Sequence, residues 1–124
     1  MCSWHAVGVL RDELIDYCLA KPGAVETYPF GEGELVAKVG DKAFAFIGMT
    51  SGTVGVKCGR TADDAAEYRE RYPDDVTVSA YIGRYGWNRV NTGGTIPDDE
   101  VRELVDRSYD AIVATLPRSR RPAR

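Results

Sequence analysis

The sequence has 124 residues, 44% of them hydrophobic, which corresponds to one globular domain. No apolar run approaches the roughly 20 residues of a membrane-spanning helix, and no basic segment followed by an apolar one opens the chain, so we expect a cytoplasmic protein with no membrane partner. The formal net charge is −3. Residues 1–116, called the body below, have a charge of −7, whereas residues 117–124, the tail, contain four arginines and no acid. Because an acidic body repels phosphate at long range, any nucleic-acid contact must come from a local basic patch or from the tail.

The cysteines and the lone histidine limit the chemistry that the chain can carry. Cys2, Cys18 and Cys58 are odd in number and far apart, which argues against a disulfide framework and against a metal knuckle. We expect reduced thiols, with Cys18 and Cys58 buried as small hydrophobic residues. His5 is the only histidine, which excludes a histidine-dependent triad or a multi-histidine metal site. Since no base, nucleophile and orienting group can be assembled, we predict no enzymatic activity, cofactor or metal.

The first third of the chain predicts one helix followed by a loop. Apolar residues recur at helical spacing from Val7 to Leu19, and Pro22-Gly23 ends this helix. Residues 24–33 contain a proline and two glycines that disfavour regular structure. We predict a packed loop in which Tyr28 or Phe30 anchors the helix to the sheet.

Three strands are predicted next. Residues 35–39 and 43–47 are strand-like and flank Gly40-Asp41-Lys42, where a glycine at the first turn position suits a type II′ hairpin. Residues 53–58 alternate between apolar and small or polar side chains, as expected of a strand with one face in the core and one in water.

The remaining elements are a short helix, two strands and a long helix. Thr61 can cap a helix that extends to about Tyr72. Residues 76–81 and 87–91 predict the fourth and fifth strands, and Pro97 opens the last helix, with acidic residues set against the positive end of its dipole. The apolar positions of that helix form one stripe: Val101, Leu104, Val105, Tyr109, Ile112, Val113 and Leu116.

This order predicts an α+β fold, a two-layer sandwich. Hairpin-length connections imply an antiparallel sheet of about five strands, with the N- and C-terminal helices packed on one face and a short helix between strands 3 and 4. Residues 1–117 form a single domain, and residues 118–124 are predicted to be a disordered basic tail.

One cluster combines side chains that can hold a phosphate, stack on a base or read a base edge. The candidate contacts are Arg84, Trp87, Asn88 and Arg89, with Lys38 and Lys57 as neighbours on the exposed sheet face. Trp87 can equally finish the core, which is the favoured interpretation because aromatic residues dominate core burial. The two arginines can instead pair with acids of the body. In the tail, Arg118, Arg120 and Arg121 are candidates for nonspecific contacts.

Six short motifs in a fixed order resemble the MmcQ/YjbR family of small bacterial proteins from about Val7 to Pro117. They are Tyr28-Pro29-Phe30-Gly31, Val54-Gly55-Val56-Lys57-Cys58, Tyr72-Pro73, Trp87-Asn88-Arg89-Val90, Ile96-Pro97-Asp98-Asp99 and Ser108-Tyr109-Asp110. The resemblance implies the fold called CyaY-like and a DNA-binding role, through similarity to a double-wing DNA-binding domain.

The family motifs coincide with part of the candidate cluster. They imply Lys57, Arg84, Trp87 and Asn88 as contacts. Many members of the family carry histidines at the positions that are Ile82 and Gly86 here, so we do not expect a histidine-linked function in this chain.

Three functions remain open at this point. The leading hypothesis is a non-enzymatic cytoplasmic binding module, monomeric, with DNA as its ligand. The second is a protein-interaction or regulatory domain with an unidentified protein partner, which would use a sheet edge or the loop from Tyr28 to Phe30. The third is a small-ligand site between the Tyr81 to Trp87 segment and that loop.

Overall fold

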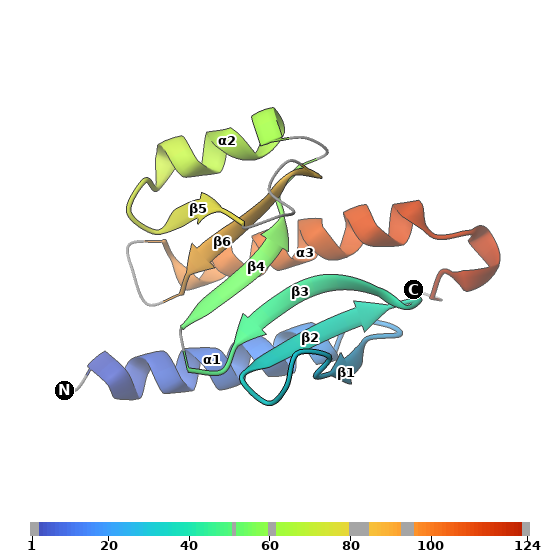
Figure 1. Ribbon diagram of the computed structural model, residues 1–124, viewed down its shortest axis with the longest axis horizontal. Coiled ribbons are helices and arrows are strands. Elements are labelled where there is room, and N and C mark those ends of the chain that lie inside the picture. Colours follow the sequence, from blue (N-terminus) through green and yellow to red (C-terminus); the bar gives the residue numbers. More distant parts are fainter. Residues whose placement is uncertain (1–2, 51, 60–61, 80–84, 93–95, 123–124) are drawn as a thin grey trace.

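The computed structural model describes residues 3–50, 52–59, 62–79, 85–92 and 96–122, with side chains from Arg11 onward (Figure 1). Among the described helices, none is long and apolar enough to cross a membrane. The elements are, in order, α1 (Ser3–Leu19), β1 (Val25–Thr27), β2 (Glu34–Val39), β3 (Lys42–Gly48), β4 (Thr53–Lys57), α2 (Ala62–Arg71), β5 (Val76–Val78), β6 (Trp87–Asn91), α3 (Asp98–Thr115) and a 3-10 turn, η2 (Arg118–Arg120).

The described residues form a sheet of six antiparallel strands in the order β1-β2-β3-β4-β6-β5. The predicted α+β two-layer sandwich is therefore confirmed, with one strand more than predicted. The extra strand, β1, is three residues long and lies at the sheet edge within the segment that we expected to be a loop. Because Val25 and Glu26 are both exposed, this strand has no apolar alternation that a sequence could reveal.

The turn between β2 and β3 differs in type from the prediction. The strands are antiparallel as expected, with Val39 opposite Lys42, but both turn residues have positive φ, 56° at Gly40 and 68° at Asp41. Positive φ at both positions is a type I′ turn, so the predicted type II′ turn is wrong. A Cβ on Gly40 would also lie 2.7 Å from Cδ1 of Leu116, so the Leu116 side chain would have to move to make room for it.

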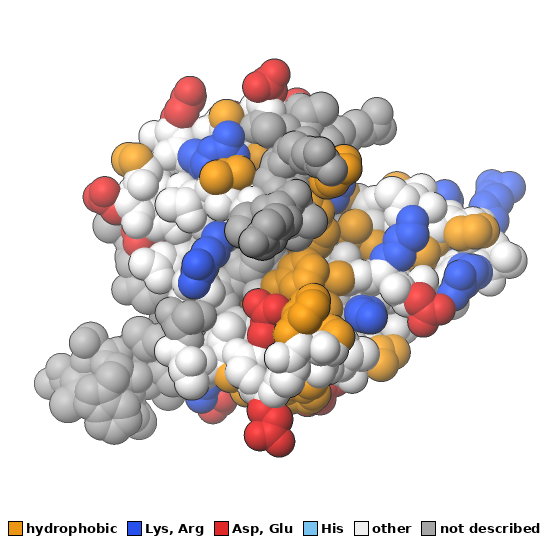
Figure 2. Space-filling view, viewed as in Figure 1, with side chains coloured by type: hydrophobic (Ala, Val, Ile, Leu, Met, Phe, Trp, Pro, Cys, Tyr) orange, Lys and Arg blue, Asp and Glu red, His pale blue; other side chains and the backbone are white. Residues whose placement is uncertain are grey.

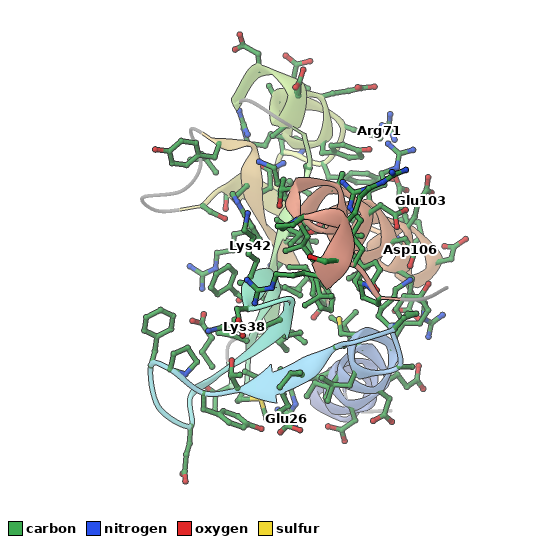
Figure 3. The ribbon with its side chains drawn as sticks, turned by 90° about the vertical axis from the view of Figure 1, so that its right-hand side faces the viewer. Glu26, Lys38, Lys42, Arg71, Glu103 and Asp106 are labelled. Atoms are coloured by element: carbon green, nitrogen blue, oxygen red, sulfur yellow. The ribbon has the colours of Figure 1, made fainter. Side chains whose placement is uncertain are left out.

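The three helices form one layer against a single face of the sheet (Figures 1 and 3). All the predicted apolar positions of α3 are buried. At the centre of the core, the rings of Phe44 and Tyr109 meet edge to face with centroids 5.2 Å apart. At the β5 and β6 edge, α2 joins α3 through the bond from Arg107 to the Tyr68 hydroxyl. The opposite face of the sheet, which none of these helices covers, is called the open face below.

A serine on α3 links the helix layer to two strands. Beyond the pair Ala45 and Val56, β3 and β4 are no longer paired in the ladder. The Ser108 hydroxyl lies there, donating to the Phe44 carbonyl at 2.6 Å and accepting from the Lys57 amide at 2.9 Å. Ser108 is fully buried, so these bonds replace two bonds that the ladder does not supply.

The first loop and the tail both differ from the prediction. Tyr28 is 41% exposed and Phe30 is 73% exposed, so neither anchors the first helix to the sheet. The residues after Pro117, expected to be disordered, form a 3-10 turn over Arg118–Arg120. Arg120 pairs with Asp41 at 2.6 Å and Arg121 donates to the Leu116 carbonyl, which ties this segment to the body.

Of the described cysteines, Cys18 is fully buried and Cys58 is half-buried, and both are free thiols. Burial raises the pKa of Cys18 to about 12 and that of Cys58 to about 11. Both groups are therefore protonated thiols near neutral pH, as expected for buried cysteine.

Candidate nucleic-acid interface

The register of the sheet decides which predicted contacts share a face. Lys57 on β4 lies directly opposite Trp87 on β6, and Gly55 lies opposite Arg89. Because side chains at paired positions point to the same side and alternate along a strand, Lys57, Trp87 and Arg89 all belong to the open face. Asn88, between the last two, points the other way.

The Lys57 side chain is partly held by the segment that precedes β6. Its Nζ donates to the carbonyl oxygen of Tyr85, a residue whose own side chain is half exposed. Partial burial lowers the pKa of Lys57 from its ordinary value. The amine is therefore held against the backbone of the segment that precedes β6.

Trp87 is a packing residue. It is 8% exposed and its ring meets Phe46 of β3 at a centroid distance of 5.3 Å and an interplanar angle of 71°. Phe46 is half-buried, so the accessible part of this aromatic pair lies mainly on Phe46. The favoured interpretation of the sequence, in which Trp87 packs into the core, agrees with this burial.

Asn88 faces the helix layer and has no exposed surface. Its Nδ2 donates to the Ala65 carbonyl at 3.0 Å, and its Oδ1 accepts a bond from Arg69 at 2.7 Å. Both partners lie on α2. The residue therefore holds α2 against the sheet, and it does not lie beside Lys57 and Arg89 as the sequence alone suggested.

The remaining predicted contacts are spread across the molecule. Lys38 lies on β2, on the side of the sheet opposite Glu103 and Asp106 of α3 (Figure 3). It is half-buried, and two strand spacings, about 10 Å, separate β2 from β4. Arg84 lies outside the described residues. The tail arginines Arg118, Arg120 and Arg121 are exposed and follow α3 at the end of the chain.

Acidic and basic residues are segregated between the two layers. The three helices contain thirteen acidic and five basic residues, whereas the six strands contain two acidic and four basic. Figure 2 shows the open face, where Lys and Arg side chains flank a strip of hydrophobic ones. Most acidic residues therefore lie in the helices, and Figure 2 also shows acidic side chains beside the hydrophobic strip and at the rim of the open face.

Two residues of the open face had no place among the predicted contacts. Phe46 and Gly55 are paired across β3 and β4, both partly exposed, in the row that ends with Arg89. Gly55 could have been found from the sequence as a position of close approach in a strand, and the neighbour is the Phe46 side chain, whose Cδ2 lies 3.6 Å from where a Cβ would be. The position of Phe46 on the open face could not be predicted from the sequence, since an aromatic residue in an apolar run is normally assigned to the core.

A shallow hollow lies beside the first loop, lined by Tyr28, Gly31, Glu32 and Met49. The small-ligand site was predicted between this loop and the Tyr81 to Trp87 segment. Residues 80–84 are outside the described part of the chain, and Trp87 does not line this hollow. No group of three or more potential metal ligands comes together among the described residues.

Comparisons with known proteins identify the family. A family model described as YjbR matches residues 19–111. The chain is 32% identical over 109 residues to the Uncharacterized protein YjbR of Escherichia coli strain K12, covering 88% of this chain and 92% of that protein; the O157:H7 protein gives the same values.

A solved structure gives the same assignment. The crystal structure of Deinococcus radiodurans protein DR2400, of the DUF419 domain family, has a TM-score of 0.79 and 25% identity, covering 89% of this chain and 83% of that one. Because the family model matches most of the sequence and the relatives extend over 88% of it, the chain belongs to the YjbR family.

Proposed function

We propose that this protein is a non-enzymatic, cytoplasmic, monomeric module that binds DNA through the open face of its sheet. The observation that supports this most is the charge segregation: Lys57 and Arg89 lie together on the face that none of the described helices covers, while most acids lie in the helices. Cationic side chains held on a flat surface neutralise phosphates and release counterions, which is the main source of nonspecific affinity for DNA.

The proposed interface contains fewer residues than the sequence suggested. Lys57 and Arg89 supply the charge, and Lys38 extends the basic surface toward β2. The Trp87 ring packs against Phe46, and because Trp87 is buried it is not accessible to a ligand. Asn88 contributes to stability only, because its amide is occupied by α2.

The test is the fluorescence anisotropy of labelled DNA with the full chain at low and near-physiological salt. We expect Arg89→Ala and Lys57→Ala to weaken binding several-fold each, because each removes one phosphate contact. Arg102→Ala is the matched control, since it removes the same charge from the helix layer, where Arg102 pairs with Glu13 and Asp98. Equal losses in all three variants would show an effect of net charge and contradict an interface on the open face.

The tail needs its own variant because it carries four of the sixteen basic residues. Replacing Arg118, Arg120, Arg121 and Arg124 by glutamine in the full chain leaves the open face intact. We expect binding to persist with a smaller dependence on salt. If binding disappears in this variant, the interaction belongs to the tail and the open face has no role in it.

A protein-interaction role is the second candidate, and one observation favours it. Val25 is 56% exposed and lies on the edge strand β1, close in sequence to the exposed Tyr28 and Phe30. An edge strand flanked by exposed apolar side chains is a surface on which a partner strand can add. Repeated recovery of one protein by the native chain, and its loss with Phe30→Ser, would support this role; recovery that is equal with both would contradict it.

A further inference from the structure

Residues 117–122 of the tail are docked on the body beside the turn between β2 and β3. The side chain of Leu116, the last residue before them, packs on Gly40 of that turn, where the absence of a Cβ leaves room for it. Arg121 then folds back onto α3: its Nε donates to the Leu116 carbonyl at 3.0 Å and its Nη2 to the Ala114 carbonyl at 3.2 Å. Because the carboxyl end of a helix carries partial negative charge, this guanidinium caps α3 and fixes the tail to it.

Two further contacts hold the tail in place. Arg120 pairs with Asp41 of the same turn at 2.6 Å. Pro122 packs against the turn that follows α1, since a Cβ on Gly23 would lie 2.9 Å from its Cγ. The tail therefore contacts two segments of the body that are far from it in sequence, and its side chains have defined positions. Cations that are already in place lose less conformational entropy when they bind an anion than those of a flexible chain.

Several cations beside the docked tail are not neutralised. Among the described residues, no acidic side chain pairs with Lys38, Lys42 or Arg118. Lys42 and Arg118 are exposed, and Lys42 donates to the Thr115 hydroxyl at 3.1 Å, which is a neutral partner. By contrast, cations of α2 and α3 pair with acids of the same helical layer; they include Arg71, Arg102 and Arg107. The uncompensated positive charge therefore lies beside the tail and on the strands.

The turn-tail patch is the surface formed by Lys42, Arg118 and Arg120. Figure 3 shows Lys38 and Lys42 on the same side of the molecule, the side of the sheet away from Glu103 and Asp106 of α3. Figure 2 shows Lys and Arg side chains gathered at the end of the molecule where α3 meets the tail. The patch therefore continues the basic surface of the open face, and Lys38, close to the turn in sequence, connects the two.

We propose that the turn-tail patch is a second region that contacts the phosphate backbone of duplex DNA, and that it does so while the tail stays docked. The proposal rests on the DNA-binding function above and extends that interface from β4 and β6 to the turn between β2 and β3. A duplex is stiff and carries phosphates throughout its length, so cations fixed in both regions can neutralise it at the same time. Asp41 restrains this binding, because it neutralises Arg120 within the patch.

The first test removes the acid from the patch. The fluorescence anisotropy of a labelled duplex is measured with the full chain and with Asp41→Asn at near-physiological salt. Asparagine suits the positive φ at this position and leaves Arg120 unpaired, so we expect binding to become several-fold tighter. Asp99→Asn is the matched control, since it makes the same charge change near the start of α3, roughly 25 Å from the tail along the helix, where salt screens it. Equal tightening in both variants would reflect net charge alone and overturn the proposal.

The second test separates a docked tail from a flexible one. A glycine-serine insertion between Pro117 and Arg118 keeps every charge but breaks the attachment to Asp41. We expect it to weaken binding as much as Arg118→Gln does, and each to make the slope of log K against log salt shallower by about 0.9, the value for one phosphate contact. Native-like binding by the insertion variant would show that a flexible tail suffices and would overturn the docked contact. Lys42→Gln, which changes an exposed side chain of β3, should match Arg118→Gln and covers the case in which the insertion variant does not fold.

The outcomes separate this proposal from the function on which it rests. If the native chain binds no DNA, the DNA-binding function fails and the turn-tail patch fails with it. If Arg89→Ala weakens binding whereas Asp41→Asn and Lys42→Gln leave it unchanged, the open face binds DNA and the patch is overturned. Tighter binding by Asp41→Asn, together with weaker binding by Lys42→Gln and by the insertion variant, is the result that supports the patch.

Discussion

Arg69 of α2 donates a hydrogen bond to Oδ1 of Asn88 at 2.7 Å, and this bond turns a predicted DNA contact into a structural residue. The other half of the Asn88 amide bonds the Ala65 carbonyl at 3.0 Å. Asn88 therefore uses both ends of its side chain to attach one helix to one strand. A buried amide with both ends occupied is worth more to the fold than to a ligand.

Replacing Asn88 by alanine should destabilise the protein by about 1–3 kcal/mol, because the Arg69 guanidinium and the Ala65 carbonyl both lose a buried partner. The measurement is the free energy of unfolding from urea denaturation. Asn91→Ala is the control, since Asn91 is an exposed asparagine on the same strand whose Nδ2 donates one long hydrogen bond, 3.5 Å, to Asp75. Equal stability of the native chain and Asn88→Ala would contradict the structural role.

Long periodic elements of the fold could be predicted from the sequence, whereas a short edge strand and a turn type could not. The 3.6-residue periodicity predicted α3, whose whole apolar stripe is buried, and alternation of apolar and polar residues predicted β4 and β5. Strand β1 was missed because it is short and exposed at the sheet edge. The turn type was wrong because a glycine at the first turn position fits both I′ and II′, and only the φ of Asp41 distinguishes them.

The candidate site was less predictable than the fold for a geometric reason. A sequence places Trp87, Asn88 and Arg89 together, whereas alternation along a strand separates them onto two faces. The phase of that alternation depends on which face the helices cover, which is a tertiary property. In the same way, the pairing of Gly55 with Phe46 and Arg89 requires the register of three strands.

Ser108→Ala should destabilise the protein by about 1–3 kcal/mol, although serine to alanine is often neutral in a helix. The Phe44 carbonyl and the Lys57 amide would both lose their partner at a buried position where the ladder between β3 and β4 has ended. Urea denaturation of this variant beside Ser119→Ala, an exposed serine, measures the effect. The same shift in both would show that the hydroxyl bridge contributes nothing.

Stability should fall as the pH rises above about 9, and Cys18 should account for part of the fall. Burial raises the pKa of its thiol from 9.0 to about 12. The unfolded chain loses this proton above pH 9 while the folded chain keeps it, so the stabilisation is fully present below pH 9 and declines by about 1.4 kcal/mol per pH unit until about pH 12.

Cys18→Ala isolates this contribution. At neutral pH the variant should be less stable, because it leaves a cavity and has lost sulfur contacts in the core. Between pH 9 and 10.5, the difference in the free energy of unfolding between the native chain and the variant should shrink, since only the native chain carries the thiol at position 18. A difference that is constant over this range would show that the pKa of Cys18 is not raised.

Two glycine to alanine changes should have effects of opposite sign. Gly40→Ala forces a side chain into a positive φ of 56° and places its Cβ 2.7 Å from Cδ1 of Leu116, so we expect destabilisation of about 1–3 kcal/mol. Gly55→Ala meets neither obstacle, and relief of glycine entropy in a strand should stabilise the fold by about 0.5–1 kcal/mol. Thermal or urea unfolding of both variants checks the pair. Destabilisation by Gly55→Ala comparable to that of Gly40→Ala would show that the Phe46 ring, whose Cδ2 lies 3.6 Å from the place of a Cβ on Gly55, packs too closely on β4 for any side chain there.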